Sequence, residues 1–253
     1  MPHIEVTDIA KSFERDGRTR QVLRRVSLSV ELGEFVSIVG AMGSGKSTLL
    51  GMMAGLVTPD AGTVTVGGVP VTGVVAGAAF VFQNYSLLPW LSARENVRLA
   101  VATAFPGETK AQHLARADAA LARVGLGAAL DRKPRRLSGG MRQRVAFLRT
   151  LLAGRSLLCL DEPFGALDAL TRGQMQRWLA DALLQEPRTV LLVTHDVEEA
   201  ALLADRIVLL SPRPGRVVET IEVDLPRPRA RTDLAIVELR ERALAAIEQR
   251  ELA

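Results

Sequence analysis

The stretch 40–47 constrains this chain more than any other part of the sequence. It reads Gly-Ala-Met-Gly-Ser-Gly-Lys-Ser, which matches the pattern G-x-x-x-x-G-K-S of a loop that binds phosphate groups. Residues 34–39 are rich in β-branched side chains and predict a strand, and residues 48–54 predict the first turns of a helix. The motif therefore lies between a strand and a helix N-terminus. This context disfavours the alternative of a glycine-rich turn that binds nothing.

Each residue type in this loop has a physical role in holding an anion. Glycines allow backbone N–H groups to turn inward, and the helix N-terminus adds unpaired donors and a favourable dipole. Lys46 would place a cation on the β- and γ-phosphates, and the Ser47 hydroxyl would ligate Mg²⁺. The residues predicted to surround the phosphates are Gly40, Gly43, Ser44, Gly45, Lys46, Ser47 and Thr48.

The composition limits the class of protein. The chain has 253 residues, of which 48% are hydrophobic, so it can bury a sizeable core as one large α/β domain or two small ones. A formal net charge of +4, with scattered arginines, does not predict a nucleic-acid surface. The single cysteine, Cys159, cannot form an internal disulfide, which fits a reducing cytosol. With neither a signal-peptide core at the N-terminus nor an apolar window of membrane-spanning length, we expect that another chain would supply any membrane span.

The hydrophobic pattern predicts strands on both sides of a helical region. Alternation over residues 4–30 predicts antiparallel strands around a polar turn at 14–20, and residues 63–71 predict a hairpin. The continuous apolar runs 157–160 and 189–194 are typical of central parallel strands. The other predicted elements are strands at 79–82, 207–211 and 216–223, and helices at 92–105 (opened by a capping box), 109–124, 138–152, 170–184, 198–204 and 233–250.

Phe13 lies at the start of the polar turn and has two interpretations. It could belong to the edge of the core, or it could offer a platform on which an adenine ring stacks. From the residue alone, the core interpretation is favoured.

Reactive side chains follow the predicted central strands. Asp161 and Glu162 come directly after one apolar run, and His195 comes directly after another. Ligands of open α/β sheets bind at the carboxyl ends of strands, so one cleft can hold these groups together with the phosphate loop. A carboxylate there can hold Mg²⁺, a second can deprotonate a water molecule, and a histidine can contact the γ-phosphate.

A longer set of motifs resembles the ATP-binding cassette (ABC) ATPases. Residues 137–144 read Leu-Ser-Gly-Gly-Met-Arg-Gln-Arg, which is similar to the signature motif of that family, and the other family motifs follow in the expected order. The resemblance covers the chain to about Asp224. It implies an α/β P-loop NTPase fold with a mostly parallel central sheet, an N-terminal antiparallel β-subdomain and a helical subdomain, at about 90–150, that carries the signature motif. The ATPase domain would span 1–225, followed by a linker and helix at 226–253.

The resemblance also implies roles for single residues. Phe13 resembles the aromatic residue that stacks on adenine, which reverses the interpretation from the residue alone. Gln83 resembles the glutamine that senses Mg²⁺ and the γ-phosphate and links to the membrane partner. Asp161 is similar to the carboxylate that holds the metal, Glu162 to the general base and His195 to the switch histidine. The implied activity is hydrolysis of ATP with Mg²⁺.

Family members work as head-to-tail dimers, which gives the second glycine-rich segment a purpose. Ser138, Gly139 and Gly140 of one copy would close over ATP held by the phosphate loop of the other copy. Asp168 resembles the aspartate that crosses this dimer interface. One copy alone should therefore be a poor ATPase.

Less specific sequence similarities indicate a subfamily of these ATPases. The segments 81–97, 210–216 and 224–229 resemble those of nitrate, sulfonate and taurine importers, although Met42 and Gly165 replace residues that are commonly serine. This implies permease subunits as partners, a solute-binding protein as an indirect partner, no nucleic acid, and a location on the cytoplasmic face of the bacterial inner membrane. The apolar loop 85–91 would contact the permease. Alternatives are an exporter ATPase, which the motifs allow, or a soluble ABC protein acting on ribosomes or DNA, which usually carries two cassettes or a long coiled-coil insertion.

Overall fold

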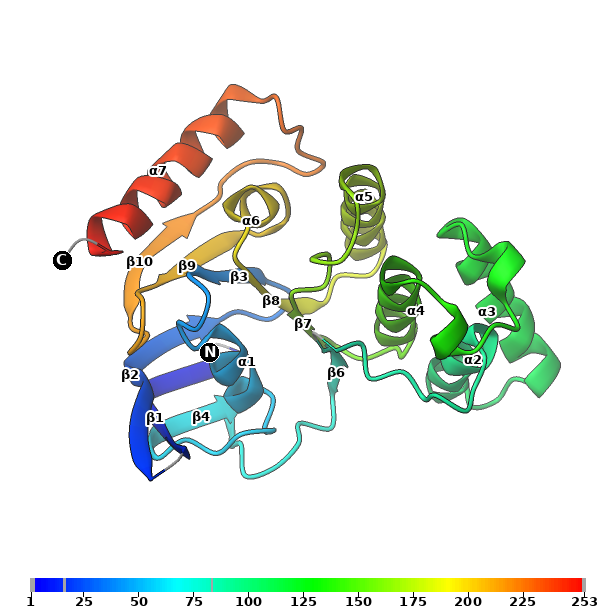
Figure 1. Cartoon of the computed structure of the whole chain (residues 1–253), viewed down its shortest axis with the longest axis horizontal. Helices are drawn as coiled ribbons and strands as arrows, with labels where there is room; N and C mark the ends of the chain where they lie inside the picture. Colours follow the sequence, from blue (N-terminus) through cyan, green and yellow to red (C-terminus); the bar gives the residue numbers. More distant parts are fainter. Residues whose placement is uncertain (1–2, 16, 83, 252–253) are drawn as a thin grey trace. The chain divides into compact units, whose positions relative to one another are not determined.

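The computed structural model describes residues 3–15, 17–82 and 84–251. These residues divide into two units. The first unit joins Met1–Ala78 to Ala180–Ala253, and the second unit is Ala79–Leu179. Figure 1 colours them by sequence, so that the blue, cyan, yellow and red parts mostly belong to the first unit and the green parts to the second.

An antiparallel sheet in the first unit confirms the strands predicted near the N-terminus. Its order is β2-β1-β4-β5, and each strand is antiparallel to its neighbour. Alternate residues of β1, such as Ile4 and Val6, are buried, as the alternating pattern requires. The strands are β1 (Ile4–Arg15), β2 (Arg18–Val30), β4 (Ala61–Val66) and β5 (Val69–Pro70).

A second sheet in the first unit is mostly parallel. Strand β3 (Phe35–Gly40) pairs in parallel with both β8 (Thr189–Thr194) and β9 (Arg206–Leu210), and β10 (Val217–Glu222) pairs antiparallel with β9. Every residue of β3 and β8 is buried, which explains why these strands read as continuous apolar runs rather than as alternating ones.

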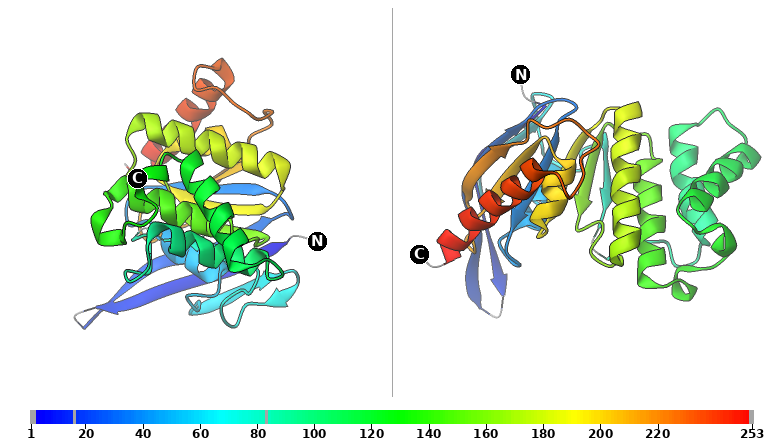
Figure 2. Two further views of the ribbon diagram at one scale, coloured as in Figure 1. Left: turned by 90° about the vertical axis from the view of Figure 1, so that its right-hand side faces the viewer. Right: turned by 90° about the horizontal axis from the view of Figure 1, so that it is seen from above.

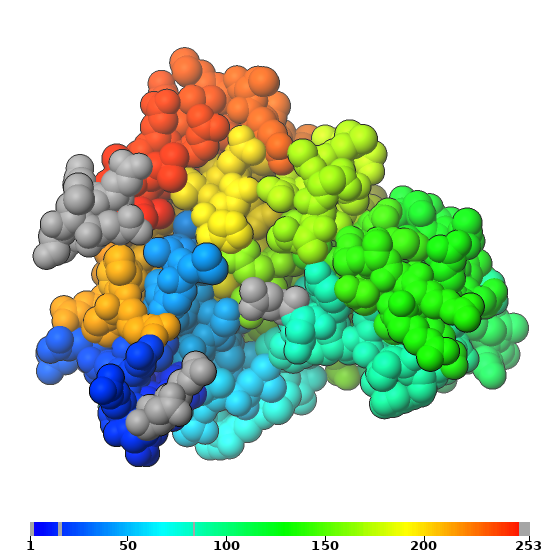
Figure 3. Space-filling model, in the orientation of Figure 1, coloured from blue at the N-terminus to red at the C-terminus, as the bar shows by residue number. Residues whose placement is uncertain are grey.

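Three helices accompany this sheet: α1 (Lys46–Met53), α6 (Val197–Leu203) and α7 (Leu234–Glu251). The C-terminal α7 packs on α6 and on β9, so it is a packed part of the first unit. Its apolar residues Ile236 and Ala243 are 1% and 0% exposed. Figures 2 and 3 show α7, in red, beside α6, in yellow.

The second unit consists of two short strands and a group of helices. The strands are β6 (Ala78–Val81) and β7 (Leu157–Asp161). Phe147, Phe164 and Trp178 pack in its core with ring centroids 5.5 and 5.6 Å apart. The helices are α2 (Ala93–Ala104), α3 (Lys110–Arg123), α4 (Gly139–Leu151) and α5 (Ala169–Gln185), with short 3₁₀ turns η1 (Gly127–Ala129) and η2 (Pro134–Arg136).

Local capping explains where these helices begin. Ser92 and Glu95 form the predicted capping box at the start of α2, and Thr109 forms a second box at the start of α3. Helix α1 begins two residues earlier than predicted because Gly45 takes the N-cap position, so Lys46 and Ser47 belong to its first turn. Over the residues described, no helix combines the length and the apolar character that crossing a membrane requires.

Candidate nucleotide-binding site

The phosphate loop connects β3 to α1 through a backbone that needs glycine. Gly45 has a φ of 99°, a left-handed conformation that side chains disfavour. A Cβ atom there would lie 2.6 Å from Cδ2 of Leu23, on the neighbouring β2. Position 45 therefore excludes a side chain for two independent reasons, and the glycine allows the loop to turn directly into the helix.

The positively charged side chain of Lys46 spans the phosphate loop. Its Nζ atom donates hydrogen bonds to the carbonyl oxygens of Gly40, at 2.7 Å, and Ala41, at 2.9 Å, and the residue is 6% exposed. Ser44 is 1% exposed, and its hydroxyl has no hydrogen-bond partner among the described residues. Burying a hydroxyl group without a hydrogen-bond partner costs free energy, and a phosphate oxygen would accept its hydrogen bond. The loop therefore fits an oxyanion.

A cavity of about 330 Å³ lies beside the loop and extends the site beyond the phosphates. Phe13 contributes to its wall and is 43% exposed, so the interpretation of Phe13 as a core residue is wrong. An exposed aromatic ring beside a phosphate loop can stack on a flat base. The lining residues are Phe13, Arg20, Val22, Gly43, Gly45, Lys46, Ser47, Thr48 and Arg213.

Two arginines in this wall were not predicted as site residues. Arg213, in the turn between β9 and β10, donates a hydrogen bond of 3.1 Å from Nε to the carbonyl of Gly43. Arg20 reaches the same cavity from β2. The sequence offered one signal, because the segment around Arg213 already resembled an importer motif. Arg213 is 170 residues from Gly43 in the sequence, so no local pattern could predict the contact.

His195 lies at the same edge of the parallel sheet as the phosphate loop. The register pairs Val39 of β3 with Thr194 of β8, so Gly40 and His195 are the next residues of neighbouring strands. His195 is exposed, and Asp196 after it caps α6 by accepting hydrogen bonds from the N–H groups of Glu198 and Glu199. Two of the three strand ends in the strand-end argument, those followed by the phosphate loop and by His195, are therefore neighbours in the first unit, whereas Asp161 and Glu162 belong to the second unit.

The second unit places Asp161 at the end of β7 and Glu162 in the turn that follows. Glu162 has a φ of 49°, a left-handed conformation that is uncommon for a residue with a side chain. Gln143 of α4 bridges this turn: its Nε2 donates to the carbonyl of Glu162 at 3.3 Å, and its Oε1 accepts from the N–H of Ala166 at 3.1 Å. Gln143 was not predicted as a site residue, although it lies in the signature segment.

The signature segment begins α4. Ser138 is the N-cap of α4, because its hydroxyl accepts a hydrogen bond of 3.2 Å from the N–H of Met141, and Gly139 and Gly140 form the first turn. Asp168 accepts hydrogen bonds from the N–H and the hydroxyl of Thr171 at the start of α5, and these bonds lower the pKa of its carboxyl group. The predicted residue Gln83 lies outside the described residues.

The predicted site residues therefore fall into two groups, one in each unit. The first unit holds Phe13, the phosphate loop and His195, and the second holds the signature segment, Asp161, Glu162 and Asp168. Within the described ranges, no three or more His, Cys, Asp or Glu side chains cluster as a metal site.

Comparisons with known proteins place these features in a family context. The family model described as "ABC transporter" matches residues 23–165. The chain is 49% identical to the taurine import ATP-binding protein TauB of Mesorhizobium japonicum, over 90% of this chain and 87% of that protein. It is 47% identical to the bicarbonate transport ATP-binding protein CmpC of Synechocystis, over 91% of this chain. It is also 44% identical to the nitrate import ATP-binding protein NrtC of the same organism, over 92% of this chain.

The coverage of these relatives differs. The chain spans only 35% of the length of CmpC and of NrtC, whereas it spans most of TauB. Among solved structures, the dimeric post-hydrolysis state of the ATP-binding cassette MJ0796, bound to ADP and Pi, superposes with a TM-score of 0.79 and 29% identity. The match covers 88% of this chain and all of that one. The mostly parallel sheet, antiparallel sheet and helices are those of an ABC cassette.

Proposed function

Since this chain belongs to the ABC transporter family, we propose that it is the subunit that binds and hydrolyses ATP to energise import of a small solute. The observation that carries the proposal is the cavity in which Phe13 lies beside the phosphate loop. The names of the relatives support nitrate, taurine, bicarbonate or a sulfonate as the class of solute.

The lining of the cavity suits both the base and the phosphates of a nucleotide. The adenine ring would stack on Phe13, and the phosphates would lie in the loop against the N-terminus of α1. Three cations, Lys46, Arg20 and Arg213, line the cavity and would offset the charge of the triphosphate. The pocket thus combines an exposed aromatic ring with three cationic side chains and the backbone of the phosphate loop.

The family resemblance assigns the magnesium ligands. The Ser47 hydroxyl and the Asp161 carboxylate are hard oxygen ligands of the kind Mg²⁺ takes, and Gln83 would sense the ion. Mg²⁺ characteristically keeps several waters and shares its shell with substrate phosphates, so it does not need a cluster of three carboxylates. When bound, it would neutralise charge on the β- and γ-phosphates.

Glu162 is the proposed general base and His195 a contact for the γ-phosphate. A water molecule attacks the γ-phosphorus, its proton passes to the Glu162 carboxylate, and the bond to the β-phosphate oxygen breaks, which releases ADP and phosphate. His195, at the strand end next to the phosphate loop, would stabilise the charge on the transferred group.

A second copy and a permease complete the proposal. The dimeric state named for the MJ0796 structure supports a dimer. The family resemblance implies that it is head to tail, so that Ser138, Gly139 and Gly140 would close over the partner's ATP and Asp168 would lie at the interface. The importer relatives support permease subunits, with a solute-binding protein as an indirect partner, and a peripheral position on the cytoplasmic face of the membrane.

Replacement of the base tests the proposal. Glu162→Gln removes the proton acceptor but keeps the shape of the side chain, so we expect normal ATP binding, loss of turnover and a trapped dimer. The matched control is Glu238→Gln, which removes one carboxylate from the exposed face of α7. ATP turnover by Glu162→Gln at the wild-type rate, measured with the permease present, would refute the assignment.

A further inference from the structure

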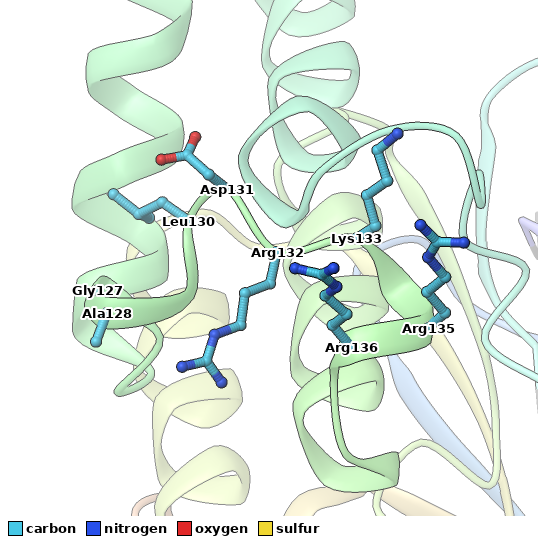
Figure 4. Close-up of a pocket in the computed structure, with 8 residues that line it drawn as sticks. All are labelled: Gly127, Ala128, Leu130, Asp131, Arg132, Lys133, Arg135 and Arg136. Carbon is cyan, nitrogen blue, oxygen red and sulfur yellow. The ribbon is translucent and has the colours of Figure 1, made fainter.

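The second unit contains a cavity that the proposed ATP site does not use. Its volume is about 480 Å³, and it lies where η1, the following turn and η2 meet. Figure 4 shows its eight lining residues, which we call the basic pocket: Gly127, Ala128, Leu130, Asp131, Arg132, Lys133, Arg135 and Arg136.

The charge of the basic pocket is strongly one-sided. Four of its residues, Arg132, Lys133, Arg135 and Arg136, are exposed cations, and none forms an ion pair within the described part of the chain. The only carboxylate is Asp131, which pairs with Arg94 at 3.3 Å. In Figure 4 the Asp131 carboxylate points away from the guanidinium group of Arg132. The like charges repel one another, and among the residues that the structure describes no carboxylate pairs with them, so an anion would lower the energy of the pocket.

The backbone beneath these cations is firmly anchored. The carbonyls of Leu130 and Arg132 accept hydrogen bonds, both of 2.9 Å, from the N–H groups of Arg94 and Ala93 at the start of α2. Pro134 is buried, and the N–H of Arg136 donates to the carbonyl of Lys133 at 2.8 Å. The cations are therefore carried on a fixed frame rather than on a mobile loop, which reduces the entropy cost of binding a ligand.

From this arrangement we propose that the basic pocket binds an anion that carries several phosphate charges. Three of the four cations are arginines, whose planar guanidinium groups match phosphate oxygens with paired hydrogen bonds. A volume of about 480 Å³ exceeds what a monatomic anion occupies and lies within the range of small-molecule sites. Free polyphosphate and the headgroups of anionic phospholipids share this chemistry.

Binding of two probes to the full-length chain tests the proposal. The first probe is inorganic tripolyphosphate, measured by calorimetry; the second is a phosphatidylcholine vesicle containing phosphatidylglycerol, measured by co-sedimentation. The phosphate loop also takes tripolyphosphate, so we expect two binding events in the wild-type chain. Arg132→Gln/Arg136→Gln should lose one event and keep the other. If lipid is the ligand, the same variant should bind the vesicles about 30-fold more weakly.

A matched variant separates the pocket from the net charge. Lys110→Gln/Arg123→Gln removes the same charge from exposed positions of α3 in the same unit, and it should bind both probes like the wild type. A loss of binding that is confined to the pocket variant supports the proposal. The probe whose binding is lost identifies the source of the phosphate. Equal losses in both variants, or no second event and no vesicle binding in the wild type, would overturn it. Because the phosphate-loop event is measured in every variant, failure here is distinguishable from failure of the proposed ATP site.

Discussion

The side-chain amide of Gln143 is hydrogen-bonded to the main chain of Glu162. Its Nε2 lies 3.3 Å from the Glu162 carbonyl, while its Oε1 holds the N–H of Ala166 at the other end of the turn. Gln143 is 2% exposed, and both bonds are part-buried. Left-handed backbone at a non-glycine residue persists where the surroundings hold it. Gln143 is therefore a positioning residue for the proposed base.

Replacing Gln143 with leucine should slow catalysis more than binding. Gln143→Leu keeps the size of the side chain but removes both hydrogen bonds, so the turn loses its link to α4, while the Glu162 carbonyl keeps its bond from the N–H of Gly165. We expect kcat to fall by about tenfold or more, with a loss of about 1–3 kcal/mol in the free energy of unfolding. Nucleotide Kd should change little. Gln174→Leu, at an exposed position of α5, is the control, and an unchanged kcat in Gln143→Leu would contradict the positioning role.

Arg213 should contribute to nucleotide affinity. It lines the same cavity as Phe13 and holds the Gly43 carbonyl, so its loss removes a cation and loosens the phosphate loop. We expect Arg213→Met to weaken ATP binding by about tenfold in low salt and by less in high salt, since exposed charges are screened. Arg216→Met removes a nearby exposed arginine that does not line the cavity. Equal effects of the two variants in equilibrium binding would show that only net charge matters.

Much of the fold could be predicted because its signals are local. Alternation in residues 4–30 predicted β1 and β2, and apolar runs predicted β7 and β8, since burial on one face or on both leaves different patterns. The capping box of Ser92 and Glu95 predicted the start of α2. The phosphate loop was likewise predicted from eight consecutive residues.

The features that escaped prediction depend on tertiary contacts. Gln143 and Glu162 are 19 residues apart, and no periodicity reports which side chain will bridge a distant turn. From the residue alone, the core interpretation of Phe13 was favoured over an adenine platform, and the family resemblance reversed that preference. The structure places Phe13 on a cavity wall. The hydrogen bond of Arg213 to the loop and the position of Arg20 on the cavity wall could not be predicted from single-sequence patterns for the same reason.

Arg229 should stabilise the first unit. Its guanidinium group donates five hydrogen bonds to the carbonyls of Leu225, Ala201, Ala204 and Val223, and so ties the chain after β10 to α6. Burial lowers the pKa of Arg229 to about 10, which still leaves it charged at neutral pH. We expect Arg229→Met to lower the free energy of unfolding by about 2–3 kcal/mol, because charge-assisted bonds are lost and carbonyls are left unpaired.

The pH dependence of this effect follows from the sign of the shift. The pKa of Arg229 is about 10 in the folded state and higher in the unfolded state, so between about pH 6 and pH 9 both states bind the proton equally. The stability difference between wild type and Arg229→Met should therefore be constant over this range in urea unfolding. Arg18→Met, at an exposed position of β2, should cost almost nothing. A difference that changed by more than about 1 kcal/mol across the range would show that Arg229 titrates there.

Asn96 clamps the apolar loop that we assign to the permease. The side chain is 0% exposed; its Oδ1 accepts from the N–H of Leu88 at 2.9 Å, and its Nδ2 lies 3.2 Å from the Leu88 carbonyl and 3.3 Å from that of Leu91. Trp90, between these anchors, is 64% exposed. A large exposed aromatic residue on a fixed loop is suited to a protein interface.

Cross-linking should detect this interface. A cysteine at Leu88 or Trp90 is expected to cross-link to a permease subunit in at least one nucleotide state, and adding Asn96→Ala should reduce the yield several-fold because the loop loses its anchors. The native Cys159 should not interfere, since it is fully buried and burial raises the pKa of its thiol. Leu32→Cys, at an exposed position between β2 and β3, is the background control. Absence of cross-links from both loop positions in every nucleotide state would place the permease contact elsewhere on the chain.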